Sequence, residues 1–336
     1  MNLNDAIALK EQLVADLMDP NNNDWYIEKY RPRHRYGALP KKSGIALGVT
    51  DLATGGYGIA IRVQDSEMDR FAEKLKSRVG GQADKQELLG NVHGVPPIRP
   101  KRTARTTLPL VIGLPISHAR CSDGRLGAFV KVRGDDDGIY ALSNNHVIAA
   151  LNRGRQGDVI TQPGRRSGGR VNRNRIGALE TFELLKWWAG VNEMDAALCK
   201  LDPNLSVSQK LGPLGIKDPT VGDIVEKRGA SDGQRGIITA VQMSLLTIRC
   251  ADSPHGFLRF DGAFEVQGLD GQAFSLPGHS GSLICVCETG QAVGLLFASR
   301  SRVRSDRGVG VTYASPIAKV LDALNADLLL SNKQVG

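Results

Sequence analysis

The chain has 336 residues, of which 41% are hydrophobic and 23% are charged, the composition of an ordinary soluble globular protein. No stretch approaches the roughly 18 consecutive apolar residues of a membrane-spanning helix, so the composition excludes an integral helical membrane protein. The formal net charge of +8 favours acidic partners without saying of which kind. The 39 glycines, with few aromatic residues, favour turn-rich β structure over a helical bundle.

The first 42 residues are predicted to form a helix and a basic connector. Apolar residues recur at helical spacing over 3–18, and the Asp-Pro-Asn-Asn-Asn sequence at 19–23 ends the helix. Residues 25–42 are basic and aromatic, and fit either a solvated linker or a partner-binding arm. The helix has no apolar core run and no cleavage signal. We therefore expect a cytoplasmic protein.

The cysteines support the same compartment. They are odd in number and have no spacing typical of a disulfide framework, so we expect free thiols. The five are Cys121, Cys199, Cys250, Cys285 and Cys287.

Residues 43–98 are predicted to form a small α/β domain. Short β-type runs at 44–49 and 58–63 flank a glycine turn, a helix is expected at 66–78, and a further strand at 88–95. This stretch has no paired carboxylates, no metal-ligand spacing and no phosphate-binding loop, because Gly80 and Gly81 follow the helix instead of preceding it. We therefore expect no catalytic group from this domain.

The basic stretch RPKRTARTT at 99–107 marks the next boundary, after which the chain becomes rich in strand signals. One block of short strands occupies 99–219, and a second occupies 220–336 and ends in an amphipathic helix at 316–329. Two successive blocks of about six strands predict a mostly β protein with two packed, six-stranded antiparallel barrels.

The sequence LPGHSGSLICVCETGQAVG at 276–294 contains the strongest candidate for a nucleophile. Ser280 lies in a tight turn with glycine on both sides, so its hydroxyl is exposed. In such a turn the backbone amides of Gly278 and Ser280 can converge on one point, as an oxyanion hole requires. Glycine and serine are also the commonest turn residues, so this string alone is a weak signal.

A serine nucleophile needs a base, and the base needs an orienting acid. His146 follows a strand in LSNNHVIA, and Asp195 opens an apolar strand in NEMDAAL. Each residue taken singly also fits a structural role at a strand end or turn. The order His146, Asp195, Ser280, spread over two β blocks, is one of the known orders of a catalytic triad.

From about residue 108 to 329 the chain resembles the trypsin/chymotrypsin-like serine peptidases. SNNHVIAA, MDAAL and GHSGS stand where that family has its histidine, aspartate and serine motifs. The likeness to intracellular bacterial and plant narrow-leaf-type trypsin-like proteins also includes GDVITQPG, IGALETF and VGLLFAS. It implies a serine endopeptidase with His146 as base, Asp195 as its orienter and Ser280 as nucleophile. It also implies an oxyanion hole at the Gly278 and Ser280 amides, and a triad in the cleft between the barrels.

Two positions depart from the family pattern. His279 replaces the aspartate that usually precedes the serine, so activation by a new amino terminus is not implied. The resemblance places the substrate pocket at Phe274, Phe297, Ala298 and Ser299. Because Phe274 stands where an acid would select Arg or Lys, we expect an apolar or small residue before the cleaved bond.

Partners and alternatives follow from the remaining signals. The resemblance implies a protein or peptide substrate, no cofactor and no metal. Some bacterial relatives act in antiviral defence on a gasdermin-like pore-forming partner, which we therefore expect as one possibility. Arginines crowd 153–175 and 300–307, and either an acidic partner or solvated loops fit them. Nucleic acid is disfavoured because no stacking aromatics are interleaved. The alternatives are a catalytically silent peptide-binding scaffold and a basic nucleic-acid-binding protein.

Overall fold

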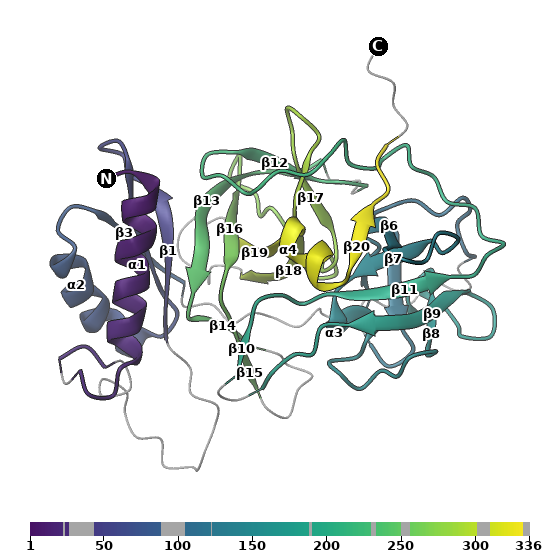
Figure 1. Cartoon of the computed structure of the whole chain (residues 1–336), viewed down its shortest axis with the longest axis horizontal. Coiled ribbons are helices and arrows are strands. Elements are labelled where there is room, and N and C mark those ends of the chain that lie inside the picture. Colours follow the sequence, from purple (N-terminus) through teal and green to yellow (C-terminus); the bar gives the residue numbers. More distant parts are fainter. Residues whose placement is uncertain are drawn as a thin grey trace.

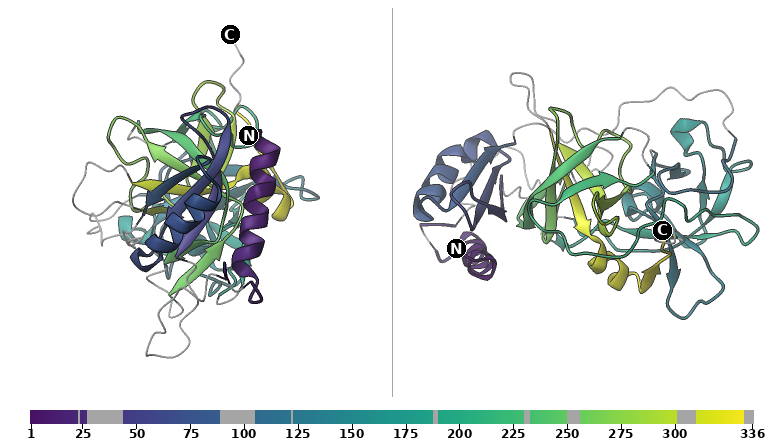
Figure 2. Two further views of the ribbon diagram at one scale, coloured as in Figure 1. Left: turned by 90° about the vertical axis from the view of Figure 1, so that its left-hand side faces the viewer. Right: turned by 90° about the horizontal axis from the view of Figure 1, so that it is seen from above.

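The computed structural model describes residues 1–22, 24–26, 44–88, 105–121, 123–187, 190–229, 233–249, 256–300 and 310–331. The predicted connector at 25–42, the linker at 99–107 and the second arginine run lie wholly or largely outside these residues. The elements fall into three units in a row, with the α/β unit at one end and the barrel that carries Ser280 in the middle (Figures 1 and 2). No described helix has the length and apolar character to cross a membrane.

The second barrel, in the middle of the molecule, is closed. Its strands follow the order β12-β17-β18-β19-β16-β13, and β13 pairs back with β12. This confirms the predicted six-stranded barrel. Its interior is filled by the inward side chains of these strands, with Phe264, Val266 and Ile284 fully buried. The bounds are β12 Ile224–Lys227, β13 Arg235–Ser244, β16 Ala263–Gly268, β17 Leu283–Val286, β18 Ala292–Arg300 and β19 Val311–Pro316.

The first β unit differs from the closed barrel expected. It is a curled eight-stranded sheet in the order β20-β6-β7-β11-β9-β8-β4-β5. Among the described residues its two edge strands, β20 and β5, do not pair with each other, so the sheet does not close. Its bounds are β4 Pro115–His118, β5 Gly124–Arg125, β6 Ala128–Val132, β7 Tyr140–Ser143, β8 Val159–Thr161, β9 Arg175–Phe182 and β11 Ala197–Leu201.

The last strand of that sheet comes from the C-terminal part of the chain. The predicted helix at 316–329 is shorter, since α4 spans Ile317–Ala323. Asn325 then adopts a left-handed conformation with φ of 50°, which ends the helix. β20 (Ala326–Leu328) pairs antiparallel with β6, with Ala326 opposite Val132. The amphipathic pattern at 324–328 therefore belongs to a turn and an edge strand.

The N-terminal unit consists of helices α1 (Leu3–Met18) and α2 (Asp69–Arg78) and three strands. β1 (Ile45–Asp51) and β2 (Tyr57–Val63) are antiparallel, and β3 (Ala83–Glu87) lies parallel to β2 after α2. The strand expected at 88–95 therefore occurs earlier in the chain, and positions 89–95 lie outside the described residues. β1 also pairs with β13, with Leu47 opposite Ser244, so this sheet continues the second barrel.

A buried ion pair joins the same two units. Arg62 of β2 and Glu265 of β16 are both fully buried, with Nη2 2.9 Å from Oε1. Tyr313 Oη donates to Glu265 Oε2 at 3.1 Å, and Thr239 Oγ1 donates to Oε1 at 2.8 Å. Burial acts to lower the pKa of Arg62, but the charge and hydrogen bond of Glu265, together with the charge of Asp84, outweigh it and the pKa is raised, so the guanidinium stays charged.

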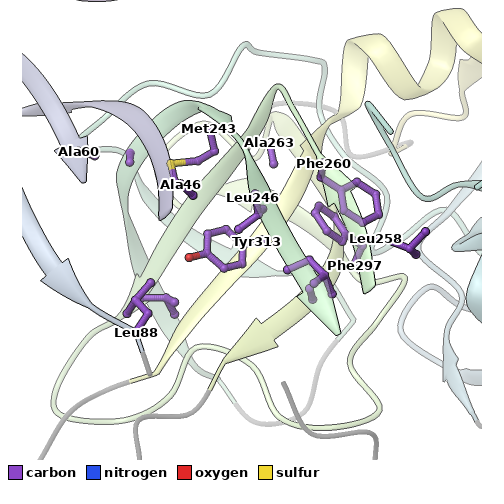
Figure 3. Packing of buried hydrophobic residues seen from close by; sticks show 14 of the residues in the cluster. Ala46, Ala60, Leu88, Met243, Leu246, Leu258, Phe260, Ala263, Phe297 and Tyr313 are labelled. Carbon is purple, nitrogen blue, oxygen red and sulfur yellow. The ribbon is translucent and has the colours of Figure 1, made fainter. Parts of the chain in front are cut away.

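Apolar side chains cover the rest of this contact. Figure 3 shows Ala46 and Ala60 of the small unit beside Met243 of β13, with Tyr313 and Phe297 further into the same cluster. α1 lies against β1 and adds a buried lysine, Lys10, whose Nζ donates to Ser244 Oγ at 3.1 Å. The small α/β domain is thus packed against the barrel through both polar and apolar contacts.

A three-stranded sheet, β10-β15-β14, connects the two β units. β14 (Leu246–Arg249) and β15 (Phe257–Phe260) lie in the chain between the barrel strands β13 and β16, while β10 (Val191–Asn192) ends shortly before Asp195. The Asn192 side chain donates to Lys186 O and Arg259 O, both at 3.0 Å. The loop before Asp195 is therefore held against the second barrel.

Candidate active site

His146 lies on α3 (Asn145–Ile148), the single helical turn that follows β7. Its Nδ1 is 2.5 Å from Asp195 Oδ2, and its backbone N–H donates to Asp195 Oδ1 at 3.2 Å. Two contacts to one carboxylate fix both the position and the rotation of the imidazole. Such a carboxylate keeps the proton on Nδ1, so Nε2 is left as the basic nitrogen.

The acid and the base differ in exposure. The Asp195 side chain is 5% exposed and that of His146 is 26% exposed. Asn144 Nδ2 donates to the Asp195 backbone oxygen at 2.6 Å and so holds the acid's main chain. The acid is shielded from water while the base is open to a substrate.

The turn that carries Ser280 packs against the strand ends that lead to His146. Arg125 N–H donates to Ser280 O at 2.7 Å, and Ser143 Oγ donates to Arg125 O at 2.8 Å. A Cβ at Gly281 would lie 2.5 Å from both Arg125 O and Ser143 Oγ, and φ there is +87°. Glycine is therefore required at this contact between the two β units.

The two predicted oxyanion-hole amides are available. Gly278 has a φ of +93°, which its lack of a Cβ permits. His279 N–H donates to Leu276 O, and Gly281 N–H donates to Leu296 O at 2.7 Å. The N–H groups on either side of the His279 amide, those of Gly278 and Ser280, form no hydrogen bond with any described residue. Two unpaired amides beside a serine can stabilise a developing oxyanion.

The structure does not join all three triad residues by hydrogen bonds. Ser280 is partly exposed, and within the described chain its hydroxyl forms no hydrogen bond to His146 or to another residue. Nucleophile-to-base bonds are often long without substrate and tighten when one binds. His146 and Asp195 are in contact, and the serine lies on the turn that packs against Arg125 and Ser143, in the strand ends that lead to His146.

A polar network next to His146 was not predicted from the sequence. Asn145 Nδ2 donates to Asn152 Oδ1 and to Glu183 O, both at 2.7 Å. Asn152 has a φ of 66° and donates through Nδ2 to Leu185 O at 2.7 Å. The pair ties α3 to the segment before Asp195. The sequence did contain one indication of this network, namely two consecutive asparagines at the end of a strand, directly before His146.

The four predicted pocket residues lie in the second barrel, mostly buried. Phe274 is fully buried in the barrel core, and a buried lysine, Lys227, stands over its ring at 4.4 Å and donates to its carbonyl oxygen. A ring in this position contacts a substrate only if its neighbours move. Phe297 stacks on Phe260 with centroids 4.5 Å apart, Ala298 is 5% exposed, and Ser299 is partly exposed.

The basic loops of the first sheet have few ion pairs. Arg175 pairs with Asp202 at 2.9 Å, and Arg165 Nη1 donates to Ala119 O at 2.6 Å. Within the described part of the chain the following form no ion pair: Arg153, Arg155, Arg165, Arg170 and Arg173. These loops therefore carry uncompensated positive charge.

The thiols and possible metal ligands add no further site. Four cysteines are described and none of them is in a disulfide, and burial raises the pKa of Cys285 to about 12, so that thiol is protonated at neutral pH. Across the described ranges no group of three or more His, Cys, Asp or Glu residues could hold a metal ion.

A scan against protein-family models and a search of curated proteins find no match. Among solved structures, the fold resembles chymotrypsin-like serine proteases. Thermobifida fusca Protease A is 17% identical with a TM-score of 0.44, over 66% of this chain and 98% of that chain. Cellulomonas bogoriensis chymotrypsin is 17% identical with a TM-score of 0.43, over the same shares. Nocardiopsis protease is 17% identical with a TM-score of 0.45, over 65% and 97%. These identities and TM-scores are too low to assign an activity, so an assignment of activity must rest on the geometry of the site.

Proposed function

We propose that the protein is a serine endopeptidase that forms an acyl-enzyme at Ser280. The observation that carries the proposal is the Asp195–His146 pair, 2.5 Å apart, in a β unit whose strand ends contact a serine turn with two unpaired amides. A buried acid, a partly exposed base and unpaired N–H groups are the parts that acyl transfer needs.

The steps follow from these positions. His146 Nε2 takes the Ser280 hydroxyl proton as Oγ attacks the substrate carbonyl carbon, and Asp195 stabilises the imidazolium that forms. The oxyanion accepts hydrogen bonds from the two unpaired amides. His146 then gives its proton to the leaving amine as the carbon–nitrogen bond breaks. A water molecule, deprotonated by the same imidazole, attacks the acyl carbon; the ester bond to Ser280 Oγ then breaks, the imidazolium returns its proton to Oγ, and the acid product leaves.

For the substrate we propose a protein cut after an apolar or small residue. The support is the absence of an acid at Phe274, where the family resemblance places the residue that selects charge. Profiling a peptide library tests this preference. A dominant preference for Arg or Lys would contradict it.

We further propose a cytoplasmic role in defence, with a gasdermin-like pore-forming protein as substrate. The support is the resemblance of the sequence motifs to intracellular bacterial relatives. Co-expression with a candidate partner encoded nearby, followed by mass spectrometry of the products, tests it. A partner that stays intact with the wild type would count against this role.

Labelling with a fluorophosphonate probe tests the enzyme proposal directly. The wild type is expected to label, while Ser280→Ala and His146→Ala lose labelling and peptide cleavage. Ser282→Ala is the matched control, because Ser282 lies two residues away and has no catalytic role in this scheme. A folded wild type that does not label would instead support the silent peptide-binding scaffold.

A further inference from the structure

The turn before Ser280 is closed by its own histidine. His279 N–H donates to Leu276 O at 3.0 Å, and Leu276 N–H donates to His279 Nδ1 at 3.3 Å. His279 is 9% exposed, whereas Leu276 is 54% exposed. The imidazole therefore folds back beneath a turn whose other end faces solvent.

We propose that His279 positions the oxyanion hole, because its unprotonated Nδ1 accepts the Leu276 amide and so fixes the turn that presents the two unpaired N–H groups. The inference rests on the proposed serine-peptidase function and adds a residue to it. His279 touches neither the substrate nor the reacting atoms in this scheme, so it is a positioning residue.

The first unpaired amide belongs to the peptide unit between Pro277 and Gly278, inside the closed turn. The ring of Pro277 fixes the φ of that residue at about −65°. Gly278 follows with a φ of +93°. Because both ends of the turn are tied through the two hydrogen bonds of His279, this peptide unit has little freedom to rotate. The Gly278 N–H keeps its direction without a hydrogen-bond partner of its own.

The second unpaired amide is fixed by the carbonyl group of His279 itself. Ser282 N–H donates to His279 O at 3.0 Å. The carbonyl of His279 and the N–H of Ser280 belong to one planar trans peptide unit, so they point in opposite directions. Holding the carbonyl on Ser282 therefore aims the Ser280 N–H away from it.

The segment that leads into the turn is anchored in the barrel. Lys227 of β12 is 5% exposed, and its ammonium donates to the carbonyl oxygen of Phe274. Ser275 Oγ and Thr312 Oγ1 of β19 are 2.6 Å apart, and both residues are buried. Since Phe274 and Ser275 are held by two strands, the turn cannot drift as a body. Its remaining freedom is internal, which is where the His279 contact acts.

The turn needs a hydrogen-bond acceptor at the position of His279 Nδ1 for the Leu276 N–H, so variants that keep or remove this acceptor test the proposal. The Oδ1 atom of asparagine is bonded to Cγ, as Nδ1 of histidine is, so His279→Asn keeps an acceptor for the Leu276 amide. His279→Leu has a similar volume and provides no acceptor. Comparing the two separates the hydrogen bond from packing.

The first readout is steady-state kinetics on a peptide amide, with labelling by fluorophosphonate alongside. We expect His279→Leu to lower kcat by about 10- to 100-fold, below the loss of about 10²- to 10³-fold for a whole oxyanion donor. KM should change less than about threefold, since the hole acts on the transition state. His279→Asn should stay within about threefold of wild type.

The second readout does not require activity. Amide hydrogen exchange at Leu276, followed by NMR, should be slow in the wild type and in His279→Asn and faster in His279→Leu. Equal exchange in all three proteins overturns the proposal, as does a kcat for His279→Leu within threefold of wild type. An Asn variant as impaired as the Leu variant also overturns it. A wild type that neither labels nor cleaves, yet shows this exchange pattern, contradicts the peptidase function while supporting the role of His279 in the turn.

Discussion

The second barrel has two interfaces, one with the α/β unit and one with the first sheet, and they are built differently. Toward the α/β unit, the sheet is continuous from β1 to β13, and the Arg62–Glu265 pair is fully buried. Toward the first sheet, the Ser280 hydroxyl and two backbone amides have no partner among the described residues, and His146 is 26% exposed.

The difference teaches where polar groups are satisfied and where they are left available. Glu265 takes hydrogen bonds from three side chains, as a buried charge requires. At the other interface Asn144 Oδ1 is buried without a hydrogen-bond partner in the described chain. Arg62 Nη2 also lacks a hydrogen bond there, but it lies 2.9 Å from the charged Glu265 Oε1, whereas Asn144 Oδ1 has no charged partner among the described ion pairs. Unsatisfied groups cost stability and are found at sites that bind or react. One interface holds the structure together, and the other leaves groups available for chemistry.

The largest expected effect is that of removing the α/β unit. Deleting residues 1–104 uncovers the paired edge of β13 and leaves Glu265 buried without its arginine. An unpaired buried charge costs about 3–5 kcal/mol, against a typical total stability of about 5–15 kcal/mol. We expect an insoluble or unfolded chain by solubility and circular dichroism, with full-length Ser280→Ala as the folded control. A soluble truncated protein with cooperative unfolding would contradict the structural role of this interface.

Asp195→Asn should do the opposite, removing activity while the protein stays folded. The change leaves His146 without the acceptor that keeps the proton on Nδ1, and kcat is expected to fall by about 10⁴-fold. The free energy of unfolding should stay within about 1 kcal/mol of the wild-type value, since asparagine has nearly the same shape as aspartate. Kinetics and calorimetry on the same sample check both parts. A small loss of activity would mean that Asp195 does not orient the base.

Arg62→Met tests the ion pair at the other interface. It leaves the Glu265 carboxylate buried and should destabilise the protein by about 3–5 kcal/mol. The double variant Arg62→Met, Glu265→Gln removes both charges and should recover part of that loss. Denaturant unfolding measures the effect, and kcat should stay near wild type while the protein is folded. Equal losses in the single and double variants would indicate lost packing as the cause.

The smallest effect is expected where β10 bridges the two β units. Asn192 is 3% exposed and holds Lys186 and Arg259 through its carboxamide. Asn192→Ala should cost about 1–3 kcal/mol of stability, and activity should fall less than tenfold. Gln156→Ala is the matched control, because this exposed carboxamide donates to Glu180 and to no other described residue, and its loss should change stability by about 0.5 kcal/mol or less. No difference between the two variants would mean that the bridge does not hold the loop.

Local patterns in the sequence were sufficient to predict much of the fold. The glycine turn at Ser280 and the six strands of the second barrel follow from turn residues and short β runs. His146, Asp195 and Ser280 were chosen from their order in the sequence. The structure places all three at the interface between the two β units, and His146 contacts Asp195. The catalytic roles of these residues stay predictions.

Other features depend on partners far along the chain, which no local pattern shows. The pairing of β1 with β13 and of β20 with β6 is of this kind. Arg62 in the middle of an apolar strand was a sign of a buried partner, but it did not indicate which one. The resemblance placed Phe274 in the substrate pocket; its side chain is fully buried, and its role in substrate selection stays a prediction.

These distant pairings also determine how the chain can fold. Arg62 and Glu265 are 203 residues apart in sequence, and Arg133 and Asp327 are 194 apart. Contacts of such separation slow folding, because a long loop must close before they form. During synthesis the α/β unit leaves the ribosome first, yet its strand β1 has no partner until β13 follows. The first sheet is completed later still, because its edge strand β20 is among the last residues to be synthesised. Newly made chains therefore carry open strand edges for most of their synthesis, and the interface between the two β units, with the candidate triad, assembles late.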